Sequence, residues 1–344
     1  MTRLRTSDPH RPGLRRVRHG RGFRYLSADG SAVAAQERER IRRLVIPPAW
    51  QDVWICPWPN GHIQALGTDA AGRRQYLYHE RFREQREEAK HEHVRRVARS
   101  LPRLRRAVDE DLAGRGLGRD RVLACAARLL DLGFFRIGGE RYARDHDSYG
   151  LTTLLREHAE CRRGEVCLDF PAKSGRRQHR ALVDDAALAV VRALLRRREP
   201  GPRLFAYREG STWHEVRAED LNAYLRERSG QDITAKDFRT WHATVLAAVA
   251  LAVSARTADA GPSARKRATA RAVREVSDYL GNTPAVCRAS YIDPLVFERY
   301  EEGVTIAAAL GRLGEDADLG TPATRGAVEQ EASGQPARER SGLG

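Results

Sequence analysis

Residues 271–300 constrain this chain more than any other stretch, because they predict two sharp breaks between helices in a short span. Apolar side chains recur there at helical spacing, and Gly281 predicts the end of the first helix. The segment Asn282-Thr283-Pro284 then predicts a capped second helix, and Asp293-Pro294 predicts the N-cap and first turn of a third. Tyr291 is therefore expected at a joint between helices, where its hydroxyl can face outward. A tyrosine simply packed at a helix junction fits the same pattern.

Arg136 follows an almost wholly apolar helix that is predicted to end at Gly133. A buried helix that leads directly into an arginine places the guanidinium at the edge of the core, which suits bidentate binding of a phosphate. An ion pair of Arg136 with Asp145 or Asp147 is the structural alternative. The sequence around Arg136 leaves both interpretations open.

Two alternating segments, 165–170 and 179–183, predict a β-hairpin with Lys173 at its tip. Among 61 lysines and arginines, the only lysines are Lys90, Lys173, Lys236 and Lys266. A lysine in so arginine-rich a chain suggests a task that arginine cannot perform, because arginine does not release its proton. General acid catalysis is such a task, although chance retention of a lysine is the alternative.

Arg239 lies in the second turn of a long helix predicted over residues 234–252, with Thr234 as its N-cap. The apolar continuity after Thr244 indicates that this helix is buried. We therefore expect the core behind the helix to hold Arg239 in place.

Five separated residues occur in an order that resembles the active site of type IB DNA topoisomerases of the short, poxvirus-like and bacterial kind: Arg136, Lys173, Arg239, Asn282 and Tyr291. The resemblance covers roughly residues 21–303. It implies that Tyr291 attacks a phosphodiester of duplex DNA to give a 3′-phosphotyrosyl link. It also implies that the two arginines and Asn282 stabilise the transition state, and that Lys173 protonates the leaving 5′-oxygen. Asn282 stands where many members have histidine, so it can donate a hydrogen bond but cannot transfer a proton.

Strand-like segments dominate residues 23–85, and the segment GRRQYLYH places Tyr76 and Tyr78 on one face of a strand. A half-buried aromatic pair is the structural alternative. The resemblance implies that Gln75, Tyr76 and Tyr78 contact DNA, and that Tyr142 of the later region does so too.

The expected fold class is α+β: a small β-rich N-terminal domain, then a mainly α-helical catalytic domain with a β-hairpin, which the resemblance implies form a C-shaped clamp on DNA. Pro102 is expected to interrupt the first long helix. The expected boundaries are a flexible basic arm at 1–20, the β-rich domain at 21–85, the catalytic domain at 86–315 and a disordered tail at 316–344.

A formal net charge of +15 indicates a polyanionic partner, and duplex DNA is the one we expect, although an acidic membrane surface would fit the charge alone. No strictly apolar run reaches eighteen residues, so no membrane span is expected. Five cysteines without a CxxC pair indicate a reducing compartment, and we expect a cytoplasmic, nucleoid-associated protein. The chain has no nucleotide-binding motif, and the histidines His91 and His93 are expected to be solvated surface rather than metal ligands. We therefore expect no metal or other cofactor, and a monomeric bacterial enzyme.

Two other functions fit part of the pattern. Tyrosine recombinases share the arginine, lysine, arginine and tyrosine, but they usually carry His-x-x-Arg where this chain has Lys236 three residues before Arg239. A β-rich N-terminal domain also favours a topoisomerase. A non-enzymatic, architectural DNA-binding protein explains the charge equally well, and it would form no covalent adduct with DNA.

Overall fold

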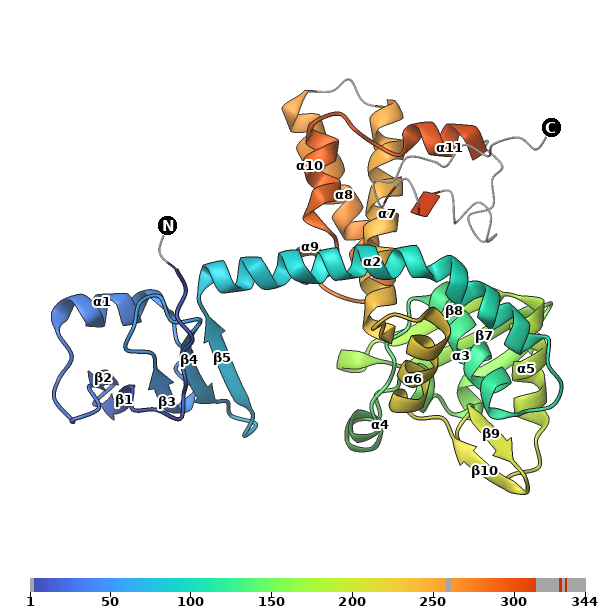
Figure 1. Cartoon of the computed structure of the whole chain (residues 1–344), viewed down its shortest axis with the longest axis horizontal. Helices are drawn as coiled ribbons and strands as arrows, with labels where there is room; N and C mark the ends of the chain where they lie inside the picture. The colour runs from blue at the N-terminus through green and yellow to red at the C-terminus, as the bar shows by residue number, and fades with distance from the viewer. Residues whose placement is uncertain (1–2, 258–260, 314–327, 330–331, 333–344) are drawn as a thin grey trace. The chain divides into compact units, whose positions relative to one another are not determined.

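The computed structural model describes residues 3–257, 261–313, 328–329 and 332, with the elements in the order shown in Figure 1. By internal contacts the chain divides into two compact units, Met1–Lys90 and His91–Gly344. The boundary falls inside one helix, α2 (Glu80–Leu112), which begins in the first unit and continues into the second. The mixed α+β class expected from the sequence is confirmed.

The first unit is built on one antiparallel sheet with the strand order β2-β1-β3-β4-β5. Its elements are β1 (Leu14–His19), β2 (Gly22–Leu26), α1 (Ala35–Arg43), β3 (Gln51–Ile55), β4 (Ile63–Thr68) and β5 (Arg74–Tyr78). Ile41 of α1, Val53 and Ile55 of β3 and Ala65 of β4 form a small core that is almost fully inaccessible to solvent. The β-rich texture is as predicted, whereas α1 was not predicted from the sequence.

The prediction of a flexible basic arm at residues 1–20 is wrong for its described part. β1 pairs with β2 and with β3, and Arg5 N donates to Asn60 O at 2.9 Å. The guanidinium of Arg16 donates to the carbonyls of Pro47 and Trp50, at 3.1 and 2.7 Å. Composition misled here because arginines that hydrogen-bond to carbonyls can belong to an ordered sheet.

The prediction that Pro102 interrupts the helical run is also wrong, because α2 continues through it. Pro102 lies on the exposed side of α2, while Leu101 and Leu104 are buried on the other side. Packing of that apolar stripe therefore outweighs the cost of a proline inside a helix, about 3 kcal/mol. His91 is likewise not solvated surface, since it is only 3% exposed.

The second unit is mainly helical and contains one three-stranded and one two-stranded antiparallel sheet. Its helices after α2 are α3 (Arg119–Gly133), α4 (Glu140–His146), α5 (Asp185–Arg196), α6 (Ala218–Ser229), α7 (Ala235–Thr257), α8 (Pro262–Leu280), α9 (Pro284–Ser290), α10 (Pro294–Glu301) and α11 (Ala307–Leu313). Its strands are β6 (Ala159–Arg162), β7 (Glu165–Pro171), β8 (Arg177–Val183), β9 (Ala206–Glu209) and β10 (Thr212–Glu215). Short 3₁₀ turns lie at η1 (Leu151–Thr153), η2 (Arg156–His158) and η3 (Lys173–Gly175).

The predicted hairpin is confirmed as β7 and β8, which pair from Glu165↔Val183 to Pro171↔Arg177. β6 extends this pair to a three-stranded sheet, which the sequence did not predict. The 3₁₀ turn η3 connects β7 to β8 and carries Lys173. The hairpin therefore presents Lys173 at its tip, as expected.

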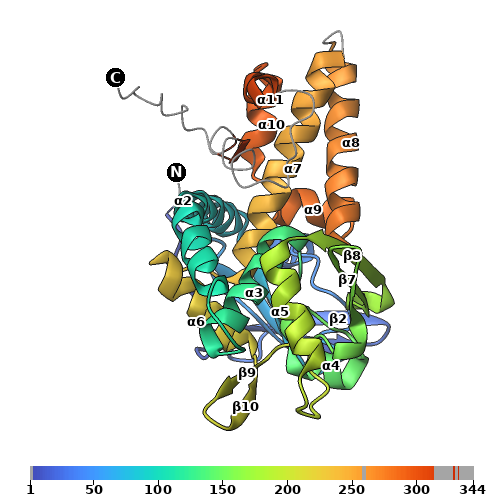
Figure 2. The ribbon, with the colours of Figure 1, turned by 90° about the vertical axis from the view of Figure 1, so that its right-hand side faces the viewer.

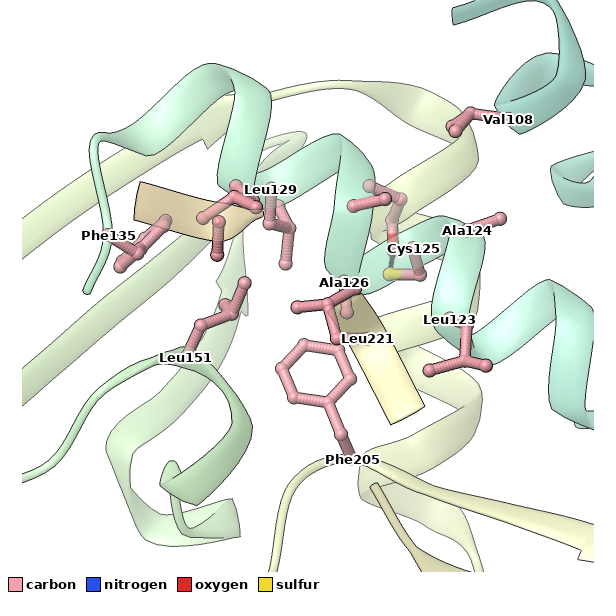
Figure 3. Packing of buried hydrophobic residues seen from close by; sticks show 14 of the residues in the cluster. Val108, Leu123, Ala124, Cys125, Ala126, Leu129, Phe135, Leu151, Phe205 and Leu221 are labelled. Atoms are coloured by element: carbon pink, nitrogen blue, oxygen red, sulfur yellow. Dashed lines mark hydrogen bonds between the residues drawn. The ribbon is translucent and has the colours of Figure 1, made fainter. Parts of the chain in front are cut away.

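α3 lies at the centre of the larger core of this unit. Leu129 and Phe135 pack there near Leu151, Phe205 and Leu221, which come from η1, the segment before β9, and α6 (Figure 3). Most of this helix is buried, including Val122–Ala127, Leu129 and Leu130, which explains why these positions are apolar. The segment that connects α3 to Arg136 therefore begins at a helix end that is packed in the core.

A second core joins α7 to α8, α9 and α10, and α7 and α8 lie side by side in it (Figure 2). Among the described residues, one stretch, Ala235–Ala255 of α7, is long and apolar enough to span a membrane. Most of this stretch is buried inside the second unit, as expected for a core helix. α7 therefore contributes buried residues to both cores of the second unit.

The predicted tail at 316–344 lies outside the described residues except for Val328, Glu329 and Ala332. Glu329 is 6% exposed and pairs with Arg105 of α2 at 2.7 Å. These described positions are therefore packed against the helical unit.

Candidate active site

Tyr291 lies at the joint between α9 and α10, where the sequence predicts it. The amide of Tyr291 donates to Cys287 O at 3.0 Å. Asp293 is the N-cap of α10 and accepts a hydrogen bond from Leu295 N at 3.1 Å. Ile292, between them, is fully buried. These contacts fix the backbone on both sides of Tyr291, whose own ring is half-buried.

Arg239 projects from the second turn of α7 and is only 5% exposed. Its Nη2 donates to Leu280 O at 2.8 Å, and its Nη1 donates to Phe134 O. Its Cζ lies 5.6 Å from the centre of the Tyr291 ring. Two backbone carbonyls from distant segments thus hold the guanidinium beside the tyrosine.

Arg136 is held by the turn that follows α3. Leu151 N donates to Arg136 O at 2.8 Å, which ties this segment to η1. The backbone segments around Gly138 and Gly150 approach so closely that a Cβ on Gly150 would lie 2.4 Å from Gly138 N. Glycine is therefore required at this crossing, and the crossing fixes the direction in which Arg136 leaves the core.

Arg136 contacts Asn282 rather than the aspartates that were the structural alternative. Its Nη2 donates to Asn282 Oδ1 at 2.5 Å, across 146 residues of sequence. Asp147 instead accepts a hydrogen bond from the Tyr149 hydroxyl at 2.7 Å. Arg136, Asn282 and, through its ring contact with Arg239, Tyr291 are thus brought into one neighbourhood.

Asn282 follows Gly281, whose φ of +64° ends α8 in the left-handed conformation. Because the Asn282 oxygen accepts from Arg136, its amide nitrogen is left as a donor. That Nδ2 is buried and has no hydrogen-bond partner among the described residues. The Nε of Arg239 is in the same condition. Buried donors without partners are unfavourable, and both nitrogens are available to an acceptor that is supplied from outside the chain.

Burial and neighbouring charge together shift the pKa values of this site. Burial lowers the pKa of Arg239 to about 10, and the neighbouring positive charge of Arg136 adds to that effect. Burial alone would raise the pKa of Tyr291, but the charges of Arg239 and Arg136, with their hydrogen bonds to it, outweigh burial and hold the pKa below its usual value. Two crowded guanidiniums and a phenol of lowered pKa form a site suited to an anion.

Lys173 is exposed, and it lines a small pocket together with Arg136 and Arg239. It forms no hydrogen bond or ion pair with another residue in the described part of the chain. Asn282 and Tyr291 do not line this pocket, although both contact its arginines. The structure therefore gathers all five predicted residues into one region, with Lys173 at its open side.

Arg180 and Gln178 line the same pocket and were not predicted from the sequence. The Nη2 of Arg180 donates to Tyr279 O at 2.7 Å, which ties β8 to the end of α8. Gln178, Arg180 and the buried Leu182 occupy every second position of β8, so all three lie on the same face of the strand. The two-residue period of the strand was therefore the available signal.

The residues predicted to contact DNA lie in both units. In the first unit, the rings of Tyr76 and Tyr78 stack with centres 5.9 Å apart, which confirms that they share one face of β5. Gln75 Nε2 donates to Asp69 Oδ2 at 2.9 Å. In the second unit, Tyr142 of α4 is 56% exposed.

The fold and the site together define an α+β protein that holds a tyrosine beside a cluster of cationic side chains. No group of three or more histidine, cysteine, aspartate or glutamate side chains placed to hold a metal ion occurs among the described residues.

Comparison with known proteins gives the family. The protein-family model for the eukaryotic DNA topoisomerase I catalytic core matches residues 79–308. The family model for the bacterial DNA topoisomerase IB N-terminal domain matches residues 22–69. The chain is 33% identical over 298 residues to DNA topoisomerase 1B of Acanthamoeba polyphaga mimivirus, covering 84% of this chain and 88% of that protein. It is 20% identical over 268 residues to DNA topoisomerase 1B of Vaccinia virus (strain Copenhagen), covering 77% and 82%. The chain belongs to the type IB DNA topoisomerase family.

Proposed function

We propose that this protein relaxes supercoiled duplex DNA by cutting one strand with Tyr291 and rejoining it. One observation carries the proposal: the half-buried phenol of Tyr291 lies against two guanidiniums that hold its pKa below the usual value. A phenol in this setting is more readily deprotonated, and phenolate is the stronger nucleophile. The relatives named DNA topoisomerase 1B support DNA as the substrate.

In the cleavage step, the Tyr291 oxygen bonds to phosphorus while the bond from phosphorus to the 5′-oxygen breaks. The product is a 3′-phosphotyrosyl ester with a free 5′-hydroxyl, and rotation of the freed end releases supercoils. Arg136, Arg239 and Asn282 donate to the non-bridging oxygens, where negative charge grows in the transition state. The unpartnered Arg239 Nε and Asn282 Nδ2 support this role. Because the ester retains the energy of the broken bond, the 5′-hydroxyl can reverse the step without ATP.

Lys173 is proposed to protonate the leaving 5′-oxygen. It shares a pocket with Arg136 and Arg239, so its ammonium can approach a phosphate that those arginines bind. The leaving oxygen would otherwise depart as an alkoxide, which is a poor leaving group at neutral pH. A proton donor positioned at the hairpin tip removes that barrier.

Duplex binding is assigned to Gln75, Tyr76 and Tyr78 on β5 and to Tyr142 on α4. The stacked pair on β5 and the exposed ring of Tyr142 give amphipathic surfaces that can face a DNA groove and its backbone. The net charge of +15 favours binding to the whole phosphate backbone. We further propose a monomeric, bacterial enzyme associated with the nucleoid in the cytoplasm, which agrees with five cysteines that form no disulfide.

The test is relaxation of supercoiled plasmid by the purified full chain, in chelator and without nucleotide. We expect relaxation of both positive and negative supercoils, and a covalent protein–DNA adduct when the reaction is stopped with denaturant. A strict requirement for magnesium or ATP would contradict the proposal.

Tyr291→Phe is the matched control, because it removes one oxygen from a half-buried ring and leaves the rest of the joint intact. We expect it to abolish relaxation and adduct while duplex binding survives and weakens steeply as salt rises. An adduct that persists in this variant would identify another nucleophile, such as Tyr279. Loss of folding is checked by its thermal unfolding curve.

A further inference from the structure

Asp293, two residues after Tyr291, has a buried side chain and makes three separate contacts, two through its carboxylate and one through its backbone amide. Its side chain is 8% exposed. Oδ1 caps α10 by accepting from Leu295 N, the backbone amide of Asp293 donates to Thr244 Oγ1 at 3.1 Å, and Oδ2 pairs with Arg95 of α2. The joint that carries Tyr291 is therefore tied to α7 and to α2 through one residue.

Thr244 holds the other side of the joint. Its hydroxyl donates to Thr240 O at 3.0 Å within α7 and reaches Tyr291 O at 3.4 Å. Since Thr244 Oγ1 also accepts from Asp293 N, α7 is hydrogen-bonded to the backbone on both sides of Ile292. α7 also carries Arg239, so the nucleophile and this arginine share one rigid support.

α2 makes further ties to the elements of the site. Arg105 pairs with Asp131 of α3 at 2.8 Å, and His93 Nε2 lies 3.6 Å from Asp237, at the start of α7. The contact of Arg95 differs from these, because its partner Asp293 belongs to the segment that carries Tyr291. The two partners are 198 residues apart in the sequence. Asp293 also has little access to water. An unpaired charge at that place would be strongly unfavourable.

We propose that Arg95 is a positioning residue for Tyr291: by neutralising buried Asp293 it holds the joint between α9 and α10 where the phenol meets Arg239. This inference rests on the proposed role of Tyr291 as nucleophile. Without Arg95, the Asp293 carboxylate gains by moving towards water, and it carries the joint with it. A displacement of the nucleophile of about 1 Å is enough to cost roughly 10²-fold in rate.

The test measures single-turnover cleavage at saturating duplex, together with duplex affinity. We expect Arg95→Met to cleave about 10- to 100-fold more slowly, with its duplex affinity unchanged. Arg95→Lys keeps the charge and should recover most of the rate. Asp293→Asn keeps a side-chain oxygen for the cap and removes the buried charge, so the double variant Arg95→Met/Asp293→Asn should be faster than Arg95→Met alone.

A second measurement needs no DNA and no catalysis. The absorbance change on ionisation of Tyr291 is obtained by subtracting the titration of the corresponding Tyr291→Phe protein. If Arg95→Met moves the phenol away from Arg239 and Arg136, the pKa of Tyr291 rises towards its ordinary value. This result is independent of whether Tyr291 attacks DNA, so failure of the proposed function and failure of this inference are distinguishable.

Arg96→Met is the matched control, because Arg96 is the next residue on α2, is 53% exposed at its side chain and pairs only with Glu92 among the described carboxylates. We expect its cleavage rate at saturating duplex and the pKa of Tyr291 to match the wild type. The proposal is overturned if Arg95→Met keeps the wild-type rate and Tyr291 pKa. It is also overturned if the whole loss lies in duplex affinity, which would make Arg95 a phosphate contact. If Arg95→Met does not fold, Arg95→Lys and the double variant decide by the same two readouts.

Discussion

The two sides of the candidate site differ in how completely they are assembled in the free protein. On the side of Tyr291 the residues are buried or half-buried and are anchored by hydrogen bonds: Arg239 is 5% exposed and donates to two backbone carbonyls, and Asn282 accepts from Arg136 at 2.5 Å. On the side of Lys173 the ammonium is exposed at a hairpin tip and has no polar partner among the described residues.

This difference matches the chemistry proposed for each side. Groups that stabilise charge on the non-bridging oxygens gain most from being fixed in advance, because no free energy is then lost in reorganising them. A lysine that must deliver a proton needs only to reach the leaving oxygen when DNA is bound. The anchored side should therefore determine the stabilisation of charge, and the hairpin side the protonation of the leaving group.

The largest expected effect that separates the two sides is that of Lys173→Ala. It should slow cleavage by about 10²–10⁴-fold, the usual contribution of a general acid. A substrate with sulfur in place of the bridging 5′-oxygen should restore the rate nearly to that of the wild type, because a thiol of pKa about 8.5 leaves without a proton donor. Single-turnover cleavage of the two substrates measures both effects. Absence of rescue would show that Lys173 has another role.

Arg239→Ala should lower cleavage by about 10²–10³-fold, the cost typical of losing one donor to a developing oxyanion. The sulfur substrate should not rescue this variant, since the defect lies at the non-bridging oxygens rather than at the leaving group. Equal rescue of Arg239→Ala and Lys173→Ala would remove the distinction between the two sides. Thermal unfolding should accompany the assay, because Arg239 also joins α7 to two distant carbonyls.

Asn282→Ala should have the smallest of these effects. A hydrogen bond to a charged group contributes about 1.5–3 kcal/mol, which corresponds to a loss of roughly 10- to 100-fold. Asn282→His retains a donor and should cleave within a few-fold of the wild type. Cleavage by Asn282→Ala at the wild-type rate would show that neither the amide donor of Asn282 nor its contact with Arg136 contributes to the step.

The sequence was most informative where a rule acts through neighbouring residues. Gly281 ends α8 and Thr283 and Asp293 cap α9 and α10, as predicted, because helix ends depend on local conformation and on the nearest side chains. The hairpin with Lys173 at its tip followed from the two-residue period in the same way. The order of the five site residues then pointed to the family that the comparisons confirm.

The sequence was misleading where composition stood in for contacts. Arginine-rich residues near the N-terminus were expected to be flexible, yet β1 is a strand whose Arg16 bonds to three carbonyls. Pro102 was expected to break a helix, yet α2 continues because its opposite face is packed. In both places the outcome depends on what the rest of the chain brings to the segment.

The sequence by itself thus determined the helix joints, the hairpin and the candidate residues of this protein. Only the tertiary structure decided that Arg136 binds Asn282 rather than Asp145 or Asp147, and that Arg95 reaches Asp293. Caps and strand periods depend on interactions over a few residues, so a single stretch specifies them. The contacts of Arg136 and Arg95 join residues 146 and 198 positions apart, and such partners are selected by the packing of whole helices against shared cores.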